Sequence, residues 1–204
     1  MVQAKQETMS SRDKILAAVK TSQPDKQPLP DFRQLQPITF GDAVSQFTTV
    51  LQNIGGSVVT ITSLSDITNY VREHFEKGHN LVTTMEGIEG LEQVSEDMDP
   101  HDLETVELAV LPAVFGVAEN GAVWLTEKEM KVRVLPFITQ HLAIVLRADS
   151  VLANMHEAYE RIGHATYGFS AFIAGPSKTA DIEQSLVLGA HGARTMTLFL
   201  MIAS

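Results

Sequence analysis

The chain has 204 residues, of which 44% are hydrophobic, and this is enough material for one well-packed core. It contains no cysteine, so it can form no disulfide and can supply no thiolate to an iron–sulfur cluster or a zinc ion. The net charge of -10 is concentrated between Glu86 and Glu127, a stretch without lysine or arginine, and this argues against nucleic-acid binding because it would repel a phosphate backbone.

The N-terminal region is expected to form a helical arm that is separate from the main domain. Residues 10–20 have the periodicity of a short amphipathic helix, and Ser10 is a capping signal at its start. Residues 21–30 contain three prolines, which favour an extended linker. We therefore expect an arm over residues 1–30 and a single domain over residues 31–204. The arm either packs on its own domain or docks on a partner.

The location of the protein is expected to be cytoplasmic. The start of the chain is polar and lacks the apolar stretch of a secretory signal. The longest late apolar run, Met196 to Ala203, is too short to cross a bilayer. The acidic stretch from Glu86 to Glu127 is interpreted as a solvated surface, with a docking surface for a basic partner as the alternative.

From Gly41 onward, helical and extended patterns alternate, as in folds where helices connect neighbouring strands of a parallel sheet. The later strands are apolar at nearly every position, which indicates burial on both faces. The predicted helices are 42–54 and 64–77, and the predicted strands are 57–61, 80–83, 106–111, 141–146, 169–174 and 195–202. The expected fold is α/β, a three-layer helix-sheet-helix sandwich with a largely parallel sheet.

A β-hairpin is predicted within this α/β body. Asn120 and Gly121 form the strongest short turn signal in the chain, and they lie between the apolar segments 114–118 and 122–125. Glu119 precedes the turn and is a candidate catalytic base or nucleophile, while Asn120 and Gly121 are candidates for ligand contact.

The strongest candidate for a working site is the segment from Ala171 to Ala193. It is interpreted as an apolar strand, a Gly175-Pro176 turn beyond the carboxyl end of that strand, and a helix that stops at Gly189. Exposed amides at the start of such a helix can bind a carboxylate or phosphate. The candidate ligand-binding residues are Gly175, Ser177, Lys178, Thr179 and Asp181.

A purely structural role for the same residues is the alternative. Ser177 or Thr179 can cap the predicted helix, and Asp181 can complement its positive end without any ligand. The segment lacks the glycine and the spacing of a Walker loop, and the chain has no dinucleotide glycine fingerprint.

Histidines and arginines offer further candidates. His191 lies between two glycines at the start of the last strand and is a candidate catalytic residue, with a hydrogen-bonded loop role as the alternative. Arg133 and His141 flank the turn at Pro136 and can supply charge and hydrogen bonds; pairing of Arg133 with Glu127 or Glu129 on the surface is the plainer interpretation. No metal site is predicted, because the apolar face of the helix that carries His156 points this side chain outward.

A family resemblance narrows these alternatives. Residues 175–183 (Gly-Pro-Ser-Lys-Thr-Ala-Asp-Ile-Glu), followed by Leu-Gly-Ala-His-Gly at 188–192, resemble the signature of the lactate-utilisation (LUD) domain family, in particular its C-type subunit. The Glu119–Ala122 hairpin and His141 fall in the family's order. The resemblance implies a fold similar to the ribose-phosphate isomerase, glucosamine-phosphate deaminase and CoA-transferase group.

The resemblance also implies a place in a system that oxidises L-lactate to pyruvate. In that system the iron–sulfur clusters belong to partner subunits, so no cofactor is expected on this chain. The first functional hypothesis is therefore a subunit with iron–sulfur partners and a small-anion site at the Gly175–Thr179 turn. The second is a stand-alone enzyme or binding module for a phosphorylated or CoA-linked small molecule.

Overall fold

The computed structural model describes residues 10–28, 36–76, 78–180, 186–188 and 191–202. The chain separates into two compact units, residues 1–36 and residues 37–204. In the first unit, helix α1 (Ser11–Thr21) begins after Ser10, whose hydroxyl accepts a hydrogen bond of 3.2 Å from the backbone N–H of Asp13. The predicted helix and its capping signal are thus confirmed.

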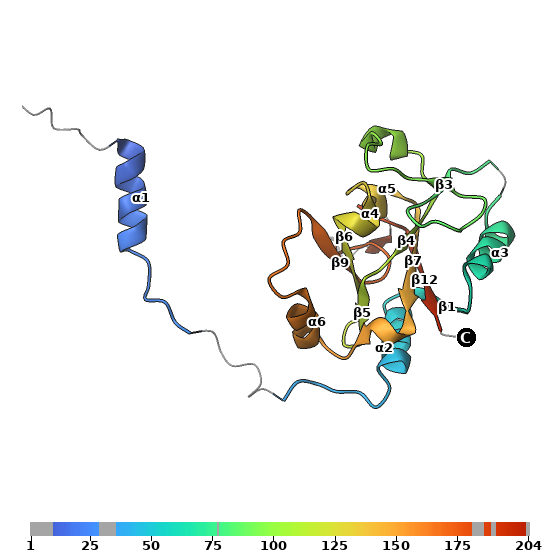
Figure 1. Ribbon diagram of the computed structural model, residues 1–204, viewed down its shortest axis with the longest axis horizontal. Helices are drawn as coiled ribbons and strands as arrows, with labels where there is room; N and C mark the ends of the chain where they lie inside the picture. The colour runs from blue at the N-terminus through green and yellow to red at the C-terminus, as the bar shows by residue number, and fades with distance from the viewer. Residues whose placement is uncertain (1–9, 29–35, 77, 181–185, 189–190, 203–204) are drawn as a thin grey trace, which may run out of the picture. The chain divides into compact units, whose positions relative to one another are not determined.

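The second unit is built on a six-stranded sheet in which every neighbouring pair of strands is parallel (Figure 1). Its central strands, β7 and β12, are paired on both sides and buried over most of their length, which explains why their sequences are apolar at successive positions. In spatial order the strands are β1 (Ser57–Ile61), β12 (Thr195–Met201), β7 (His141–Arg147), β4 (Leu108–Pro112), β2 (Leu81–Thr83) and β3 (Glu92–Gln93).

Two capped helices cover the opposite faces of this sheet. Helix α2 (Ala43–Asn53) begins at Asp42, whose carboxylate accepts backbone N–H groups of the first turn, and it buries Phe47 and Leu51 in the larger core. Helix α3 (Leu64–His74) packs on the other face, together with β-strand side chains of a second core. Each helix therefore buries an apolar stripe against one face of the sheet.

A second sheet of four strands completes the body, in the order β8-β5-β6-β9. The predicted hairpin forms two of these strands, β5 (Phe115–Val117) and β6 (Ala122–Thr126), which pair antiparallel. One face of the sheet joins the larger core, and the other packs on helix α6 (Met155–Ile162). The remaining strands are β8 (Val151–Leu152) and β9 (Ser170–Ile173), and the short helices after the hairpin are α4 (Glu127–Met130) and α5 (Leu135–Ile138).

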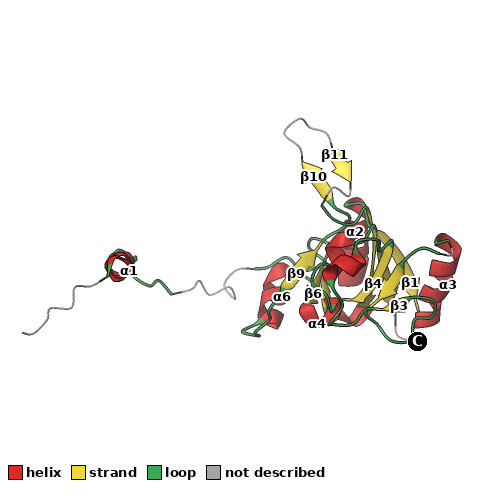
Figure 2. Cartoon of the chain, turned by 90° about the horizontal axis from the view of Figure 1, so that it is seen from above, coloured by secondary structure: helices red, strands yellow, loops and turns green. Residues whose placement is uncertain are grey.

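The layering differs from the predicted three-layer sandwich. In Figures 1 and 2, α3 and α6 lie on opposite sides, with both sheets between them. The predicted strand 169–174 forms, but as β9 it pairs antiparallel with β6 in the second sheet. An apolar run indicates a buried strand without indicating its partner, because pairing is decided by contacts that are distant in the sequence.

The prediction of a helix after the Gly175-Pro176 turn is wrong. This stretch contains β10 (Lys178–Ala180) and β11 (Leu186–Leu188), which pair antiparallel and form a separate ladder (Figure 2). At the base of this ladder the backbone N–H of Ser177 donates a hydrogen bond of 2.8 Å to the carbonyl of Ala193. This bond joins the two chain segments that lead into and out of the ladder. Pairing across the segment overrode its local helical preference. Asp181 lies outside the described residues.

None of the helices in the described parts of the chain is long and apolar enough to span a membrane.

Candidate functional site

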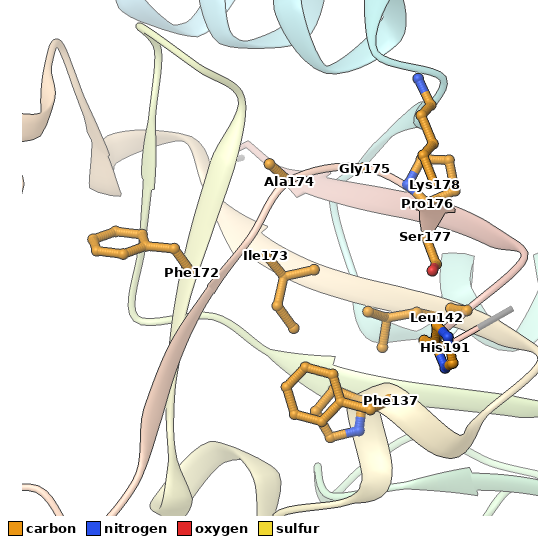
Figure 3. A pocket seen from close by; sticks show the side chains of 13 residues that line it. Phe137, Leu142, Phe172, Ile173, Ala174, Gly175, Pro176, Ser177, Lys178 and His191 are labelled. Carbon is orange, nitrogen blue, oxygen red and sulfur yellow. The ribbon is translucent and has the colours of Figure 1, made fainter. Parts of the chain in front are cut away.

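A cleft lies where the Gly175 turn approaches the loops that lead into β7 and β12 (Figure 3). It consists of one pocket of about 280 Å³ and an adjoining pocket of about 380 Å³. Both pockets are lined by Phe137, His191 and Gly192, so they form one continuous depression, which we call the Phe137–His191 cleft.

The cleft is at the opposite end of the parallel sheet from the one that was predicted. Residues 136–140 precede β7 and residues 191–193 precede β12, so the cleft lies at the amino ends of these strands. The Gly175 turn does follow the carboxyl end of a strand, but that strand is β9 of the second sheet. The rule that places ligands beyond the carboxyl ends of parallel strands therefore does not describe this site.

The base of the cleft is apolar and its polar groups lie to one side. Pro136, Phe137, Leu142 and Ile173 supply hydrophobic surface, and Phe137 is 38% exposed. In Figure 3 the side chain of Ser177 points into the pocket, on the side of His191. An apolar base with a few polar groups is the usual composition of a small-molecule site.

Gly175 allows the turn to pass close to the end of α2. Its φ angle is +72°, and a Cβ atom there would lie 3.1 Å from Cγ1 of Ile54 and 3.2 Å from the Ile54 carbonyl oxygen. Both the backbone angle and the close approach therefore require glycine at this position. The close packing fixes the turn that carries Ser177 beside the cleft.

The polar groups of the turn are arranged differently from the predicted anion site. The N–H of Ser177 is already bonded to Ala193, so it is not available to a ligand. The side chain of Lys178 points away from the pocket, toward the end of α2 (Figure 3), where its Nζ lies 3.7 Å from the position that a Cβ of Gly55 would occupy. A lysine at a helix C-terminus complements the helix dipole. The hydroxyl of Ser177 remains directed into the cleft.

His191 is exposed and lines both pockets, as expected for a residue that contacts a ligand. The glycine after it permits close packing with Ser177, because a Cβ on Gly192 would lie 3.2 Å from Cβ of Ser177. Of the predicted set, Gly175, Ser177, Lys178 and His191 thus line the cleft, with the amino group of Lys178 directed toward α2. Nothing is described of the side chain of Thr179.

The Glu119–Gly121 turn performs a different task. The Oε2 atom of Glu119 accepts a hydrogen bond of 2.9 Å from the backbone N–H of Met155, the first residue of α6. Asn120 accepts a hydrogen bond from the backbone N–H of Ala122 and so closes the hairpin. Gly121, at φ +70°, lies against the backbone of Leu51 in α2. These residues join the hairpin to two helices, and they do not line the cleft.

Arg133 and His141 are also outside the cleft. Arg133 forms an ion pair of 2.8 Å with Oε1 of Glu127, which confirms the plainer interpretation of this residue. The ring of His141 lies edge-on to Phe75, with ring centres 5.6 Å apart, in the direction of the α3 face of the sheet. Leu142, the next residue of β7, belongs to the larger core on the opposite face and lines the cleft, because successive strand residues alternate in direction.

Sequence reasoning missed the apolar base of the cleft. One feature of the sequence could have indicated Phe137. It is a large apolar residue directly after a proline in a short connection between strands, a position from which a side chain does not easily reach the core. Leu142 and Ile173 had none, because inside apolar strands they cannot be distinguished from ordinary core residues.

Comparisons with known proteins identify the family. The model of the LUD domain matches residues 100–201, a segment that contains both walls of the cleft. Curated relatives named Lactate utilization protein C include one from Bacillus pumilus, which is 30% identical over 45% of this chain and 42% of the relative. Another, from Geobacillus sp. (strain WCH70), is 36% identical over 40% of this chain and 36% of the relative. The chain thus matches less than half the length of these relatives.

A solved structure supports the fold. The crystal structure of a DUF162 family protein from Deinococcus radiodurans superimposes with a TM-score of 0.56, covering 81% of this chain and 99% of the other at 14% identity. This similarity shows the α/β fold with its mostly parallel sheet. The family model matches half of the chain, and we conclude that the chain belongs to the LUD domain family.

Proposed function

We propose that the chain is the C-type subunit of a system that oxidises L-lactate to pyruvate, and that its Phe137–His191 cleft binds a small anionic metabolite. The observation that carries the proposal is that several relatives at 30–36% identity are named Lactate utilization protein C. The family match spans every described residue of the cleft, which supports assigning the role to this site.

The chemistry of the cleft suits a short hydroxy acid. Such a molecule has a methyl group at one end, which can pack on Phe137 and Leu142. Its carboxylate and hydroxyl can pair with the Ser177 hydroxyl and the His191 imidazole at the other side of the pocket. The proposed small-anion site is therefore the cleft side of the Gly175–Thr179 turn, with side-chain donors in place of the helix amides that the sequence had predicted.

The redox chemistry of the proposed system resides in other subunits. Oxidation of a hydroxy acid to an oxo acid releases electrons, which must pass to an acceptor. A chain without cysteine provides no thiolate for an iron–sulfur cluster. We therefore expect iron–sulfur partner proteins to receive the electrons, and this chain to bind no cofactor of its own.

Growth on L-lactate tests the physiological role. Deletion of the coding sequence in the source organism should abolish growth on L-lactate and leave growth on pyruvate intact. Complementation with the wild-type chain or with His164→Ala, an exposed histidine outside the cleft, should restore growth. Complementation with His191→Ala or Ser177→Ala should not. Unimpaired growth of the deletion strain on L-lactate would show that the proposed function is wrong.

Co-purification tests the proposed partners. The full-length chain, tagged and isolated from cells growing on L-lactate, should carry cysteine-rich proteins that show the visible absorbance of iron–sulfur clusters. Recovery of the chain alone under mild conditions, at micromolar concentration, would contradict the assembly. Isolation from cells growing on pyruvate provides the matched control for non-specific binding.

The size of the cleft favours a second candidate. The two joined pockets, of about 280 and 380 Å³, exceed the needs of a three-carbon acid and fall in the range of sites for larger ligands. A stand-alone enzyme or binding module for a phosphorylated or CoA-linked molecule would use this room. The proposed similarity of the fold to the ribose-phosphate isomerase, glucosamine-phosphate deaminase and CoA-transferase group is consistent with such ligands, by analogy only.

Thermal stabilisation separates the two candidates. Acetyl-CoA or ribose 5-phosphate should raise the melting temperature of the chain if the second candidate is correct. The increase should disappear in Ser177→Ala. Lys178 lines the pocket, but its amino group points toward α2 in Figure 3, so the increase should persist in Lys178→Ala. No increase with these two probes would argue against the second candidate.

A further inference from the structure

Three polar side chains meet at the amino ends of three neighbouring strands, outside the Phe137–His191 cleft. The register pairs Thr195 of β12 with His141 of β7, and His141 with Leu108 of β4, directly after Glu107. The Oγ1 atom of Thr195 lies 2.7 Å from Nδ1 of His141, and Nε2 of His141 lies 3.5 Å from Oε1 of Glu107. The imidazole is therefore held between a hydroxyl and a carboxylate.

These contacts favour one tautomer of the neutral imidazole. A carboxylate only accepts hydrogen bonds, so Glu107, whose Oε1 lies 3.5 Å from Nε2, favours the tautomer that carries its proton on Nε2. The other nitrogen then has a free lone pair, which accepts the hydroxyl proton of Thr195. A hydroxyl bonded to a base that is oriented by a third group is the arrangement that activates nucleophilic hydroxyls in enzymes.

The three residues are held on rigid backbone. The N–H of His141 donates a hydrogen bond of 2.8 Å to the carbonyl of Glu107, and the N–H of Glu107 donates one of 2.9 Å to the carbonyl of Asn80. Neighbouring strands thus fix both the base and the carboxylate. A site built on paired strands keeps its geometry better than one built on free loops.

The cluster is accessible to a small molecule. Thr195 is exposed, and the side chains of His141 and Glu107 are 29% and 35% exposed. The ring of Phe75 stands beside the imidazole and forms an apolar wall.

We propose that Thr195 is a nucleophile that accepts acyl groups from small esters, with His141 as the general base and Glu107 as the positioning residue. Thr195 Oγ1 attacks the carbonyl carbon while its proton passes to Nδ1 of His141. The bond from that carbon to the leaving oxygen then breaks, and the same proton passes to this oxygen to release an alcohol. Water, deprotonated by His141, attacks the acyl-threonine, the bond to Oγ1 breaks, and the proton returns to Oγ1 with release of the acid.

The test uses p-nitrophenyl acetate with the full-length chain. The expected result is release of p-nitrophenolate together with an acetyl group that peptide mapping locates on Thr195. Thr195→Val keeps the shape of the side chain and removes the hydroxyl, so it should abolish this adduct. His141→Gln should slow acetylation of Thr195 by a factor of at least about 100. Thr195→Ser keeps the hydroxyl and should retain the reaction.

Glu107 requires a separate comparison because it acts through His141. Glu107→Gln should lower the rate of acetylation, and Glu107→Asp, which keeps a carboxylate, should recover part of it. A purely structural role would not distinguish these variants at equal melting temperature. Exposed lysines and histidines also react slowly with activated esters, so the position of the acetyl group decides the outcome.

Acetylation at other residues only, or equal acetylation rates in the wild-type chain and His141→Gln, would overturn the proposal. If Thr195→Val fails to fold, the mapped adduct and the His141→Gln rate in folded protein still decide it. The proposal is independent of the lactate role, because Glu107, His141 and Thr195 do not line the cleft, so growth on L-lactate and acetylation of Thr195 are separate measurements. The exposed histidine variant His164→Ala should leave acetylation of Thr195 unchanged.

Discussion

Gly116 shows how one absent side chain sets the distance between the two sheets. A Cβ atom at this position would lie 2.7 Å from Cδ2 of Leu146 in β7 and 3.0 Å from Cε2 of Phe47 in α2. These distances are shorter than carbon atoms tolerate, so strand β5 can approach the larger core only because the residue is glycine. No local pattern around residue 116 indicates this requirement, because the contact joins segments that are far apart in the chain.

Substitution of Gly116 by alanine should therefore destabilise the protein. We expect a loss of about 1–3 kcal/mol in the free energy of unfolding, because the added methyl group overpacks the core. Gly41→Ala is the matched control: a Cβ there has no atom within 4 Å, and the change should stay within about 0.5 kcal/mol. Denaturant titration of both variants measures the difference. Equal stability of the two would mean that the core adapts freely around residue 116.

Asp66 makes the start of α3 sensitive to acid. Its carboxylate accepts hydrogen bonds from the backbone N–H of Thr62, at 2.9 Å, and of Ser63, at 3.0 Å. These bonds, that from Thr62 first, lower the pKa of Asp66 below its ordinary value because they favour the charged form. Because the pKa of Asp66 is lower in the folded state than in the unfolded state, its ionised carboxylate stabilises the fold at every pH above the unfolded-state pKa. This stabilisation is lost as the pH falls through the pKa of the folded state.

Asp66→Asn should therefore affect stability in a pH-dependent way. Asparagine keeps an acceptor oxygen but cannot carry the charge that the two N–H groups favour. The wild-type chain should melt at a higher temperature than the variant near neutral pH, and the difference should shrink as the pH falls below about 4. Melting curves across this range measure the effect. A difference that stays constant into acid would contradict the assigned role of the carboxylate.

At the scale of secondary structure, local signals predicted those elements whose ends are determined locally. The boundaries of α2 follow from Asp42 at its start and from the two glycines after Ile54, and strand β1 was predicted at 57–61 as observed. The segment after Gly175 was predicted wrongly, because its pairing as β10 and β11 depends on backbone bonds across the segment and at its base. Propensity describes a segment in isolation and contains no information on such pairing.

The apolar stripe of α2 should carry much of the stability of the larger core. Leu51 is fully buried there, and its backbone supports Gly121 of the hairpin. Leu51→Ala should cost about 2–5 kcal/mol through lost burial and the cavity that remains. Gln52→Ala, the next residue and exposed, should stay within about 0.5 kcal/mol. Denaturant unfolding measures both variants, and a similar loss in the two would contradict burial of Leu51 as the cause, because alanine favours the helix at either position.

At the scale of the whole molecule, the sequence predicted the fold class and the family but not the position of the site. The cleft combines residues before β7, before β12 and after β9. Strands β7 and β12 belong to the six-stranded sheet, whereas β9 belongs to the four-stranded sheet. The pairing of Thr195, His141 and Glu107 likewise depends on the order of β12, β7 and β4. Strand order is fixed by long-range packing, so neither site could be assembled from local patterns.

The division of the chain predicts where a minimal folded protein begins. Every residue of the three hydrophobic clusters lies within the unit that spans residues 37–204. A chain that starts at Pro37 should therefore retain a cooperative unfolding transition, because it keeps the complete core. Circular dichroism during thermal unfolding measures this, with the full-length chain as reference. A chain that starts at Gly56 lacks α2 with Phe47 and Leu51, and it should lose the transition. Loss of cooperativity in the Pro37 chain would show that residues before Pro37 are required for folding.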